Sequence, residues 1–313
     1  MNHKSKKKEF DEKIKYLMND QAFKDYQRTL NSMNSQQSVY YAVKSFVEYL
    51  LLVDNEFTWD CITDVVVNKA IAKMLNKQQA PTTINTKLCA LKGVAKRLWV
   101  QGRIDGKEYQ LISDIKNVRG SRLSHGRMLT DDEVEHLFDY VNSQNKLCQV
   151  RDAAIFAVMV GTGLRRAEVA KLSVDNLHLD ESQPFMRVIG KGNKERQLPL
   201  PKLTQHYLKQ WLDVKGSKKG LLFVQILKNE TITEKALSGC SIYNICQNYV
   251  KKANMKGWTP HDLRRTCASK IISMGADLTT ARDFLGHTSI ATTQLYDKRS
   301  LKRLEDVAKK IKF

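Results

Sequence analysis

The sequence has no long apolar run, since none of its hydrophobic stretches approaches the roughly 18 residues of a membrane span. The Lys-rich N-terminus is followed by acidic residues rather than by an apolar stretch, which is unlike a signal peptide. Internal repeats and low-complexity segments are also missing. We therefore expect a cytoplasmic protein that has no membrane partner.

The spacing of the six cysteines argues against a structural metal site and against disulfide bonds. No pair has CxxC spacing, and no His/Cys cluster has the spacing of a zinc site. Disulfides are rare in cytoplasmic chains. The phosphate-binding segments described below carry no carboxylate cluster for Mg²⁺. We expect neither a bound metal nor another cofactor.

Positive charge is abundant by contrast. Lys and Arg total 52 against 33 Asp and Glu, which gives a net charge of +19. The excess is spread over the chain, with +8 on residues 1–125 and +11 on residues 126–313. A polyanion that contacts the whole molecule would explain this distribution, and nucleic acid is the obvious one. Solvated lysines are the simpler alternative.

The first part of the chain has the apolar periodicity of helices. The length of 313 residues suggests two domains. Residues 21–115 repeat apolar side chains at spacings of three and four, which predicts a small all-helical domain. Residues 1–20 are polar and Lys-rich, and we expect a flexible or marginally helical basic lead there. Lys87, Lys92 and Lys96 lie beside an apolar stripe, and they are candidate DNA contacts or a solvated face.

A short basic segment follows the helical domain. Residues 116–127, KNVRGSRLSHGR, contain Gly and Ser and few apolar residues, which is typical of a linker. Its charge suits a segment that lies along a phosphate backbone. Arg119 and Arg122 are the candidate DNA contacts in this linker. The next domain begins at residue 128, and a capping box from Thr130 to Glu133 marks its first helix.

The second domain, residues 128–298, is predicted to mix helices with strands. The helix beginning near Arg151 is almost wholly apolar, so we expect it in the core. Strand-like runs follow, with a Gly-Lys-rich turn at residues 190–194 that indicates a hairpin. The runs are 172–174, 185–189 and 196–200. From Thr204 onward helices are expected again, so the fold class is mainly α with one small antiparallel sheet.

Four segments of this domain are rich in groups that bind and activate phosphate. Two arginines can donate hydrogen bonds to the non-bridging oxygens of one phosphate. Histidine and lysine can transfer protons, and the tyrosine hydroxyl can act as a nucleophile. Each residue taken alone has a common structural explanation. Only their occurrence together, in this order and at these spacings, favours a catalytic site. The segments are 161–169, 190–196, 261–266 and 285–287, with Tyr296 nine residues after His287.

The order TGLRRAEV, GKGNKER, HDLRRT, LGH and a final tyrosine closely resembles the tyrosine recombinase (phage integrase) family, in its Xer-like two-domain form. The resemblance covers the catalytic domain with high specificity and extends more loosely to residues 21–115. It implies a helical core-binding domain and an α+β catalytic domain. Together these would form a C-shaped DNA clamp.

The resemblance also implies residue roles. The two arginines would bind the scissile phosphate, and the two histidines would assist proton transfer. Lys191 would be the general acid for the leaving 5′ oxygen, Tyr296 the nucleophile, and Glu168 a structural support of the first arginine. Lys194 and Arg196 are further candidate DNA contacts. The six implied catalytic residues are Arg165, Lys191, His261, Arg264, His287 and Tyr296.

The expected function is site-specific DNA recombination through a 3′-phosphotyrosyl intermediate, integrating or excising a mobile element. The expected partners are core recombination sites in double-stranded DNA and three further copies of the chain in a homotetramer. An apolar helical stripe in the tail, residues 299–313, would dock on a neighbouring protomer or pack on its own domain. A type IB topoisomerase and a non-catalytic DNA-binding relative are the alternatives.

Overall fold

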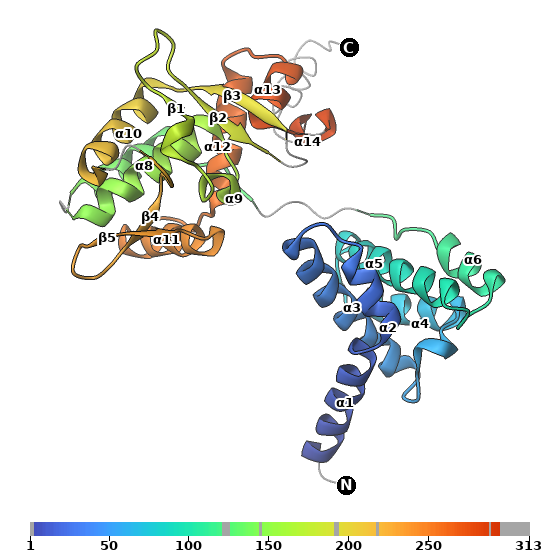
Figure 1. Ribbon diagram of the computed structural model, residues 1–313. Coiled ribbons are helices and arrows are strands. Elements are labelled where there is room, and N and C mark those ends of the chain that lie inside the picture. The colour runs from blue at the N-terminus through green and yellow to red at the C-terminus, as the bar shows by residue number, and fades with distance from the viewer. Residues whose placement is uncertain are drawn as a thin grey trace, which may run out of the picture. The chain divides into compact units, whose positions relative to one another are not determined.

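The computed structural model describes residues 3–120, 126–143, 146–190, 194–216, 219–287 and 289–294. Lys191, Tyr296, Arg122 and the tail at 299–313 lie outside these residues. The chain divides into two compact units, Met1–Ser124 and His125–Phe313 (Figure 1). No described helix could serve as a membrane span, given its length and its polar residues.

The first unit is helical throughout its described residues. Short polar side chains cap most of its helices, and Asp20, Ser32, Thr63 and Asp105 each accept a hydrogen bond from a backbone N–H of the first turn. The helices are α1 His3–Met18, α2 Gln21–Arg28, α3 Met33–Val53, α4 Asp64–Asn76, α5 Pro81–Val100 and α6 Gly106–Asp114, with a 3₁₀ turn at Trp59–Cys61.

Helices α3 and α5 form the centre of this unit and pack directly against each other (Figure 1). Phe46 and Leu50 of α3 are fully buried, as are Leu88 and Leu91 of α5. Apolar burial on this scale is the main stabilising contribution in a small helical domain. The charged residues of the unit are therefore carried mainly by the outer faces of its helices.

Of the two alternatives for residues 1–20, the structure shows a helix and not a flexible lead. Helix α1 occupies most of that stretch, and Ile14, Leu17 and Met18 are buried in the core of the first unit. The indole N–H of Trp59 donates a 2.8 Å hydrogen bond to the carbonyl of Leu17. The many lysines obscured an i, i+3, i+4 apolar spacing that anchors the helix.

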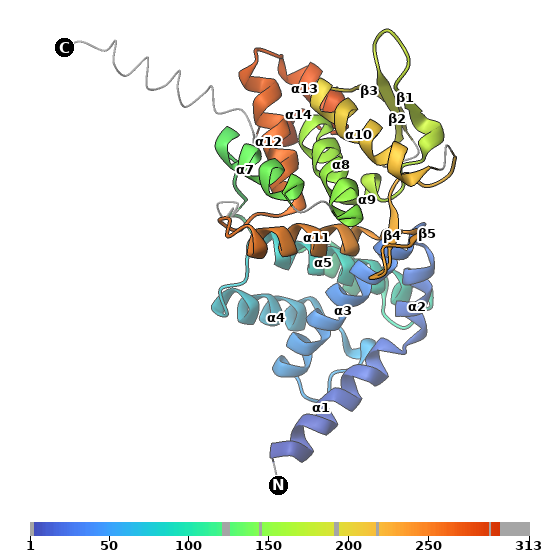
Figure 2. The same ribbon diagram turned by 90° about the vertical axis from the view of Figure 1, so that its left-hand side faces the viewer.

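In the second unit the other elements surround the buried helix α8. Residues 153–159 of α8 are each at most 1% exposed. Helices α7, α10 and α12 pack on it, with α10 and α12 on opposite sides (Figure 2). The helices are α7 Asp131–Asn142, α8 Leu147–Thr162, α9 Arg166–Val169, α10 Lys202–Lys215, α11 Gly239–Lys252, α12 Pro260–Ser273, α13 Leu278–Leu285 and α14 Ile290–Gln294.

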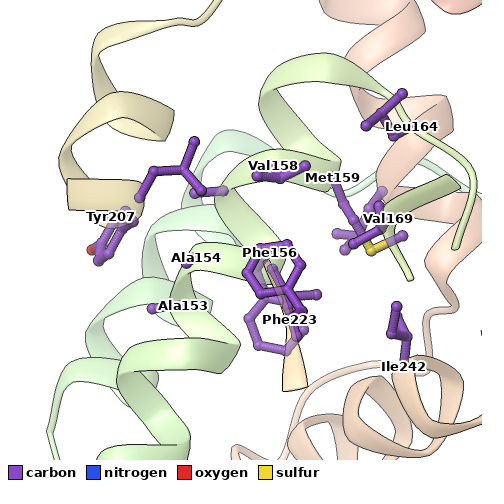
Figure 3. Close-up of a cluster of buried hydrophobic side chains, with 14 of the residues drawn as sticks. Ala153, Ala154, Phe156, Val158, Met159, Leu164, Val169, Tyr207, Phe223 and Ile242 are labelled. Atoms are coloured by element: carbon purple, nitrogen blue, oxygen red, sulfur yellow. The ribbon is translucent and has the colours of Figure 1, made fainter. Parts of the chain in front are cut away.

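Side chains from distant segments complete the core around α8. Phe156 of α8 packs edge-on against the ring of Trp258, with ring centroids 5.8 Å apart. Figure 3 shows part of this core, in which side chains of α8 meet Phe223, Val169 and Ile242. Because the C-terminal end of α8 leads directly into the segment 161–169, this rigid core supports one of the phosphate-binding segments.

Two small antiparallel sheets accompany the helices. In the first sheet Met186 pairs with Leu198, and both side chains are buried. The second sheet is a hairpin that the sequence analysis did not anticipate, because most side chains of its second strand are exposed or half-buried and give no alternating pattern. The strands are β1 Leu177–His178, β2 Phe185–Ile189, β3 Glu195–Pro199, β4 Val224–Ile226 and β5 Ile232–Ala236. The expected class, mainly α with a small antiparallel sheet, is confirmed, and the described residues add the second sheet.

Candidate active site

Arg165 is placed by the sharp turn that follows α8. Gly163 ends that helix in the left-handed region, with φ of 63°. A Cβ atom at this position would also lie 2.6 Å from a methyl group of Leu285, so a residue larger than glycine would clash. Leu164 is then buried, and Arg165 becomes the N-cap residue of α9. Its side chain is 43% exposed and can reach a ligand.

Glu168 holds Arg165 from inside the protein. Its carboxylate accepts a 2.8 Å bond from the backbone N–H of Arg165 and a 3.2 Å bond from the guanidinium of the same residue. Arg196 of β3 donates to both carboxylate oxygens, at 3.4 and 3.3 Å. Burial by itself would raise the pKa of Glu168, but the Arg165 N–H bond and the charges of Arg196 and Arg165 outweigh it, so the pKa is lowered.

Arg264 connects the ends of two helices. Its side chain projects from α12 and is only 1% exposed. One guanidinium nitrogen donates to the carbonyl of Gly163, and the other donates a 2.8 Å bond to the carbonyl of Leu285. A buried cation is stable only when hydrogen-bond acceptors compensate for its lost hydration. The cation is therefore fixed in place between the end of α8 and the end of α13.

The start of α12 is tied to the point at which the chain enters the second unit. Asp262 accepts 2.9 Å bonds from the backbone N–H groups of Thr259 and Arg127. The Arg127 side chain donates to the carbonyls of Lys256 and Gly257, at 2.7 and 2.9 Å. Residues 127 and 256–262 are thereby held together as one rigid piece.

Helix α13 brings the segment 285–287 to the same place. Asp277 caps this helix by accepting bonds from the N–H groups of Thr279 and Thr280. Gly286 ends it in the left-handed region, with φ of 64°. The guanidinium of Arg165 lies 3.4–3.5 Å from the Gly286 carbonyl. The chain then turns so that His287 becomes buried beside the arginines.

Both site histidines have lowered pKa values. The pKa of His261, in the first turn of α12, is lowered by burial and by the positive charges of Arg265 and Arg264. The pKa of His287 is lowered to about 4 by burial and then by the charges of Arg264 and Arg165. Both imidazoles are therefore neutral near pH 7, and each offers one N–H donor and one nitrogen acceptor.

A surface pocket of about 450 Å³ unites three of the six catalytic candidates. Arg165, His261 and Arg264 all line it. His287 lies close enough for its pKa to respond to both arginines. The complete lining is Arg165, Arg166, Ala167, Tyr243, Thr259, Pro260, His261 and Arg264.

The two remaining candidates, Lys191 and Tyr296, are outside the described residues, but their neighbours are described. The base of the β2–β3 hairpin is closed by a 2.8 Å bond from the N–H of Gly190 to the carbonyl of Lys194. A Cβ atom on Gly190 would lie 2.8 Å from the guanidinium of Arg196. The hairpin that carries Lys191 therefore starts beside the Glu168 cluster, and α14 ends at Gln294, shortly before Tyr296.

The structure changes the interpretation of Arg196, a candidate DNA contact. Its side chain is 16% exposed and forms an ion pair with buried Glu168, so it is engaged within the protein. Residue 196 alternates along β3 with residue 197 and shares its face with buried Leu198. Strand periodicity could have placed it inward, and its basic turn drew attention to solvent instead. Lys194, two residues earlier, is exposed.

The candidate DNA contacts of the first unit also fall into two groups, one engaged within the protein and one exposed. Lys87 is buried, where it donates a 2.8 Å bond to Gln79 and lies 5.5 Å from the ring centre of Tyr49. Burial lowers its pKa. Lys92 donates to two backbone carbonyls at the end of α6. Lys96 and Arg119 are exposed.

In the described part of the chain, no three His, Cys, Asp or Glu side chains are grouped as metal ligands would be. The charged side chains that line the pocket are arginines, and such a pocket attracts an anion.

The chain is similar in sequence to proteins of one known family. The phage integrase family matches residues 127–303. Tyrosine recombinase XerC of Alcanivorax borkumensis is 30% identical over 255 residues, which cover 80% of this chain and 79% of the relative. Tyrosine recombinase XerD of Oceanobacillus iheyensis is 27% identical over 284 residues, which cover 88% and 91%.

Solved structures share the fold. The XerH recombinase in its post-cleavage complex with a palindromic difH substrate superimposes with a TM-score of 0.69 at 21% identity, covering 88% of this chain and 80% of that one. A lambda integrase dimer bound to a core site gives 0.64 at 14% identity, covering 88% and 93%. With the family match extending over more than half of its length, the chain belongs to the phage integrase family as a Xer-like tyrosine recombinase.

Proposed function

We propose that this recombinase cleaves DNA at the pocket formed by Arg165, His261 and Arg264, through a 3′-phosphotyrosyl intermediate on Tyr296. The observation that carries the proposal is that two arginines line one pocket, each with its guanidinium group held by protein acceptors. Preorganised cations of this kind stabilise charge that develops on the non-bridging oxygens of a phosphate.

Four side chains make and break the bonds and transfer the protons of the proposed reaction. The Tyr296 oxygen bonds to phosphorus while the bond to the 5′ oxygen breaks, and Lys191 supplies the proton that the 5′ oxygen takes up. The neutral His261 and His287 offer N–H donors to the phosphate and a nitrogen acceptor for the tyrosine proton. Rejoining runs the same steps in reverse with the 5′-hydroxyl of a partner strand, so the energy of the phosphodiester is retained.

The proposed partner is double-stranded DNA carrying core recombination sites. Exchange between two duplexes breaks and rejoins four strands, which requires four protomers. The overall charge of +19 supports contact with a polyanion. The relatives named above are recombinases, which favours this function over a type IB topoisomerase or a non-catalytic DNA-binding protein.

A covalent-trapping experiment tests the proposal. Nicked suicide duplexes that carry the DNA flanking the gene are incubated with the full chain and with Tyr296→Phe. The wild-type chain should form an adduct that survives denaturing electrophoresis, and the variant should bind the duplex equally well without forming it. An adduct at the wild-type level in Tyr296→Phe would refute the assignment of the nucleophile.

The alternative enzyme is separated by a second measurement. A recombinase joins strands from two different site-bearing duplexes, whereas a topoisomerase relaxes any supercoiled plasmid and exchanges nothing. Relaxation of plasmids that lack the site, without any recombinant product from plasmids that carry it, would favour the topoisomerase.

A further inference from the structure

His287 is held by a side chain that no catalytic role explains. Its Nδ1 lies 2.9 Å from the hydroxyl oxygen of Thr293, and both residues are buried, with Thr293 fully inaccessible. Thr293 belongs to α14, and Tyr296 follows three residues later. The hydrogen bond thus joins the ring of His287 to the segment that leads to Tyr296.

Burial and the surrounding charges lower the pKa of this ring. Burial contributes most, and among the described residues Arg264, Arg165, His261 and Arg196 each disfavour a proton on His287. The imidazole is therefore neutral and has a single N–H. A nearby hydroxyl can bond either tautomer, so the partner at the other nitrogen decides which one is present.

A bound phosphate determines which nitrogen of His287 carries the proton. Phosphate oxygens accept hydrogen bonds and do not donate them, so a neutral His287 binds a phosphate only through an N–H. With Nδ1 facing the Thr293 hydroxyl, the proton has to be on Nε2. The hydroxyl then donates to Nδ1 and holds the ring in that orientation, as outer hydrogen-bond partners do for catalytic and metal-bound histidines.

We infer that Thr293 is a positioning residue that fixes the ring orientation and the Nε2–H tautomer of His287, and that links this state to the placement of the segment before Tyr296. The inference rests on the proposed function, because the phosphate defines which nitrogen must donate. Thr293 touches no substrate in this scheme and acts through His287.

Three variants separate positioning from simple packing. Thr293→Val keeps the shape of the side chain and removes the hydroxyl, whereas Thr293→Ser keeps the hydroxyl. Thr204→Val is the matched control, because Thr204 is also fully buried and its hydroxyl donates to the carbonyl of Ala157, in the core between α10 and α8. Both valine variants remove one buried hydrogen bond, and both should lower stability by a similar amount.

The first readout is spectroscopic and needs no activity. In the full chain labelled with ¹⁵N-histidine, the His287 signals are assigned by their loss in His287→Gln. The wild type and Thr293→Ser, with a phosphate-bearing duplex bound, should show the Nε2–H tautomer, and Thr293→Val should lose it or show a mixture. An Nδ1–H tautomer in the wild type, or an unchanged tautomer in Thr293→Val, overturns the inference.

The second readout is the rate of covalent-adduct formation on the suicide duplex. Thr293→Val should react roughly 10–100-fold more slowly, the usual cost of losing an outer hydrogen-bond partner, with unchanged DNA affinity. Thr293→Ser should restore most of the rate, and Thr204→Val should react as the wild type. Equal losses in the two valine variants, or none in Thr293→Val, overturn the inference. A wild type that forms no adduct refutes the proposed function instead, and the tautomer still decides the role of Thr293.

Discussion

Glu168 contacts Arg165 at two points, through the backbone N–H and through the guanidinium. One carboxylate thereby fixes both the start of the residue and the end of its long side chain. The same carboxylate also forms an ion pair with Arg196. Glu168 is therefore a buried acceptor shared by two cations, and its charge is required in the folded state.

Glu168→Gln should reduce the free energy of unfolding near pH 7 by about 1–3 kcal/mol, because the amide carries no charge and its NH2 group cannot accept the bonds that one carboxylate oxygen receives from Arg165 and Arg196. The folded-state pKa of Glu168 is lowered, so its stabilising contribution is fully present above the pKa of the unfolded chain. It is lost as the pH falls through the folded-state pKa. Urea unfolding of both proteins across this acid range should show their difference shrinking. The exposed Glu195 on β3 provides the control substitution Glu195→Gln, which should leave stability unchanged.

Substitutions of Arg264 and Arg165 should differ in their effect on stability, although both residues are proposed to bind the same phosphate. Arg264→Met should cost about 2–4 kcal/mol, because the buried carbonyls of Gly163 and Leu285 lose a charged donor. Arg165→Met should cost less than about 1 kcal/mol, because that guanidinium is partly exposed and its ion pair is weakened by solvent. Both variants should lose covalent-adduct formation. Equal stabilities measured by urea unfolding would contradict this view of Arg264.

Lys191 should behave as an acid that assists the leaving group. Lys191→Ala should cleave an ordinary phosphodiester about 10²–10⁴-fold more slowly. A duplex with a bridging sulfur in place of the 5′ oxygen needs no such proton, and it should restore most of the rate of Lys191→Ala. The same duplex should not rescue Arg165→Ala, whose missing charge acts on the non-bridging oxygens. Rescue of the arginine variant alone would require the two roles to be exchanged.

Two lysines on the same helix should respond differently to salt. Lys96 is exposed on α5, and Lys96→Ala should reduce the slope of log affinity against log salt concentration by about 1 if it contacts a phosphate. Lys87 is buried against Gln79 and Tyr49, and Lys87→Met should leave that slope unchanged. Fluorescence anisotropy with a labelled duplex measures both. A smaller slope in Lys87→Met would show that α5 rearranges on DNA.

The sequence predicted the structure best at helix ends, where a short local pattern of residue types determines the conformation. The capping box from Thr130 to Glu133 follows from helix-end chemistry and is found as expected. The burial of Arg196 and Lys87 was not predicted, because a charged side chain in a basic stretch resembles a solvated one. Their burial depends on partners distant in sequence, Glu168 for Arg196 and Tyr49 for Lys87. Local pattern carries no information about such partners.

The bonds between Asp262 and Arg127 have a mechanical consequence. Residue 127 lies two residues after the start of the second unit, and it is fastened to the helix that carries His261 and Arg264. Its side chain also pairs with Glu133 of α7. A displacement at this position therefore acts on α7 and α12 together, and through α12 it reaches the residues that are proposed to bind the phosphate.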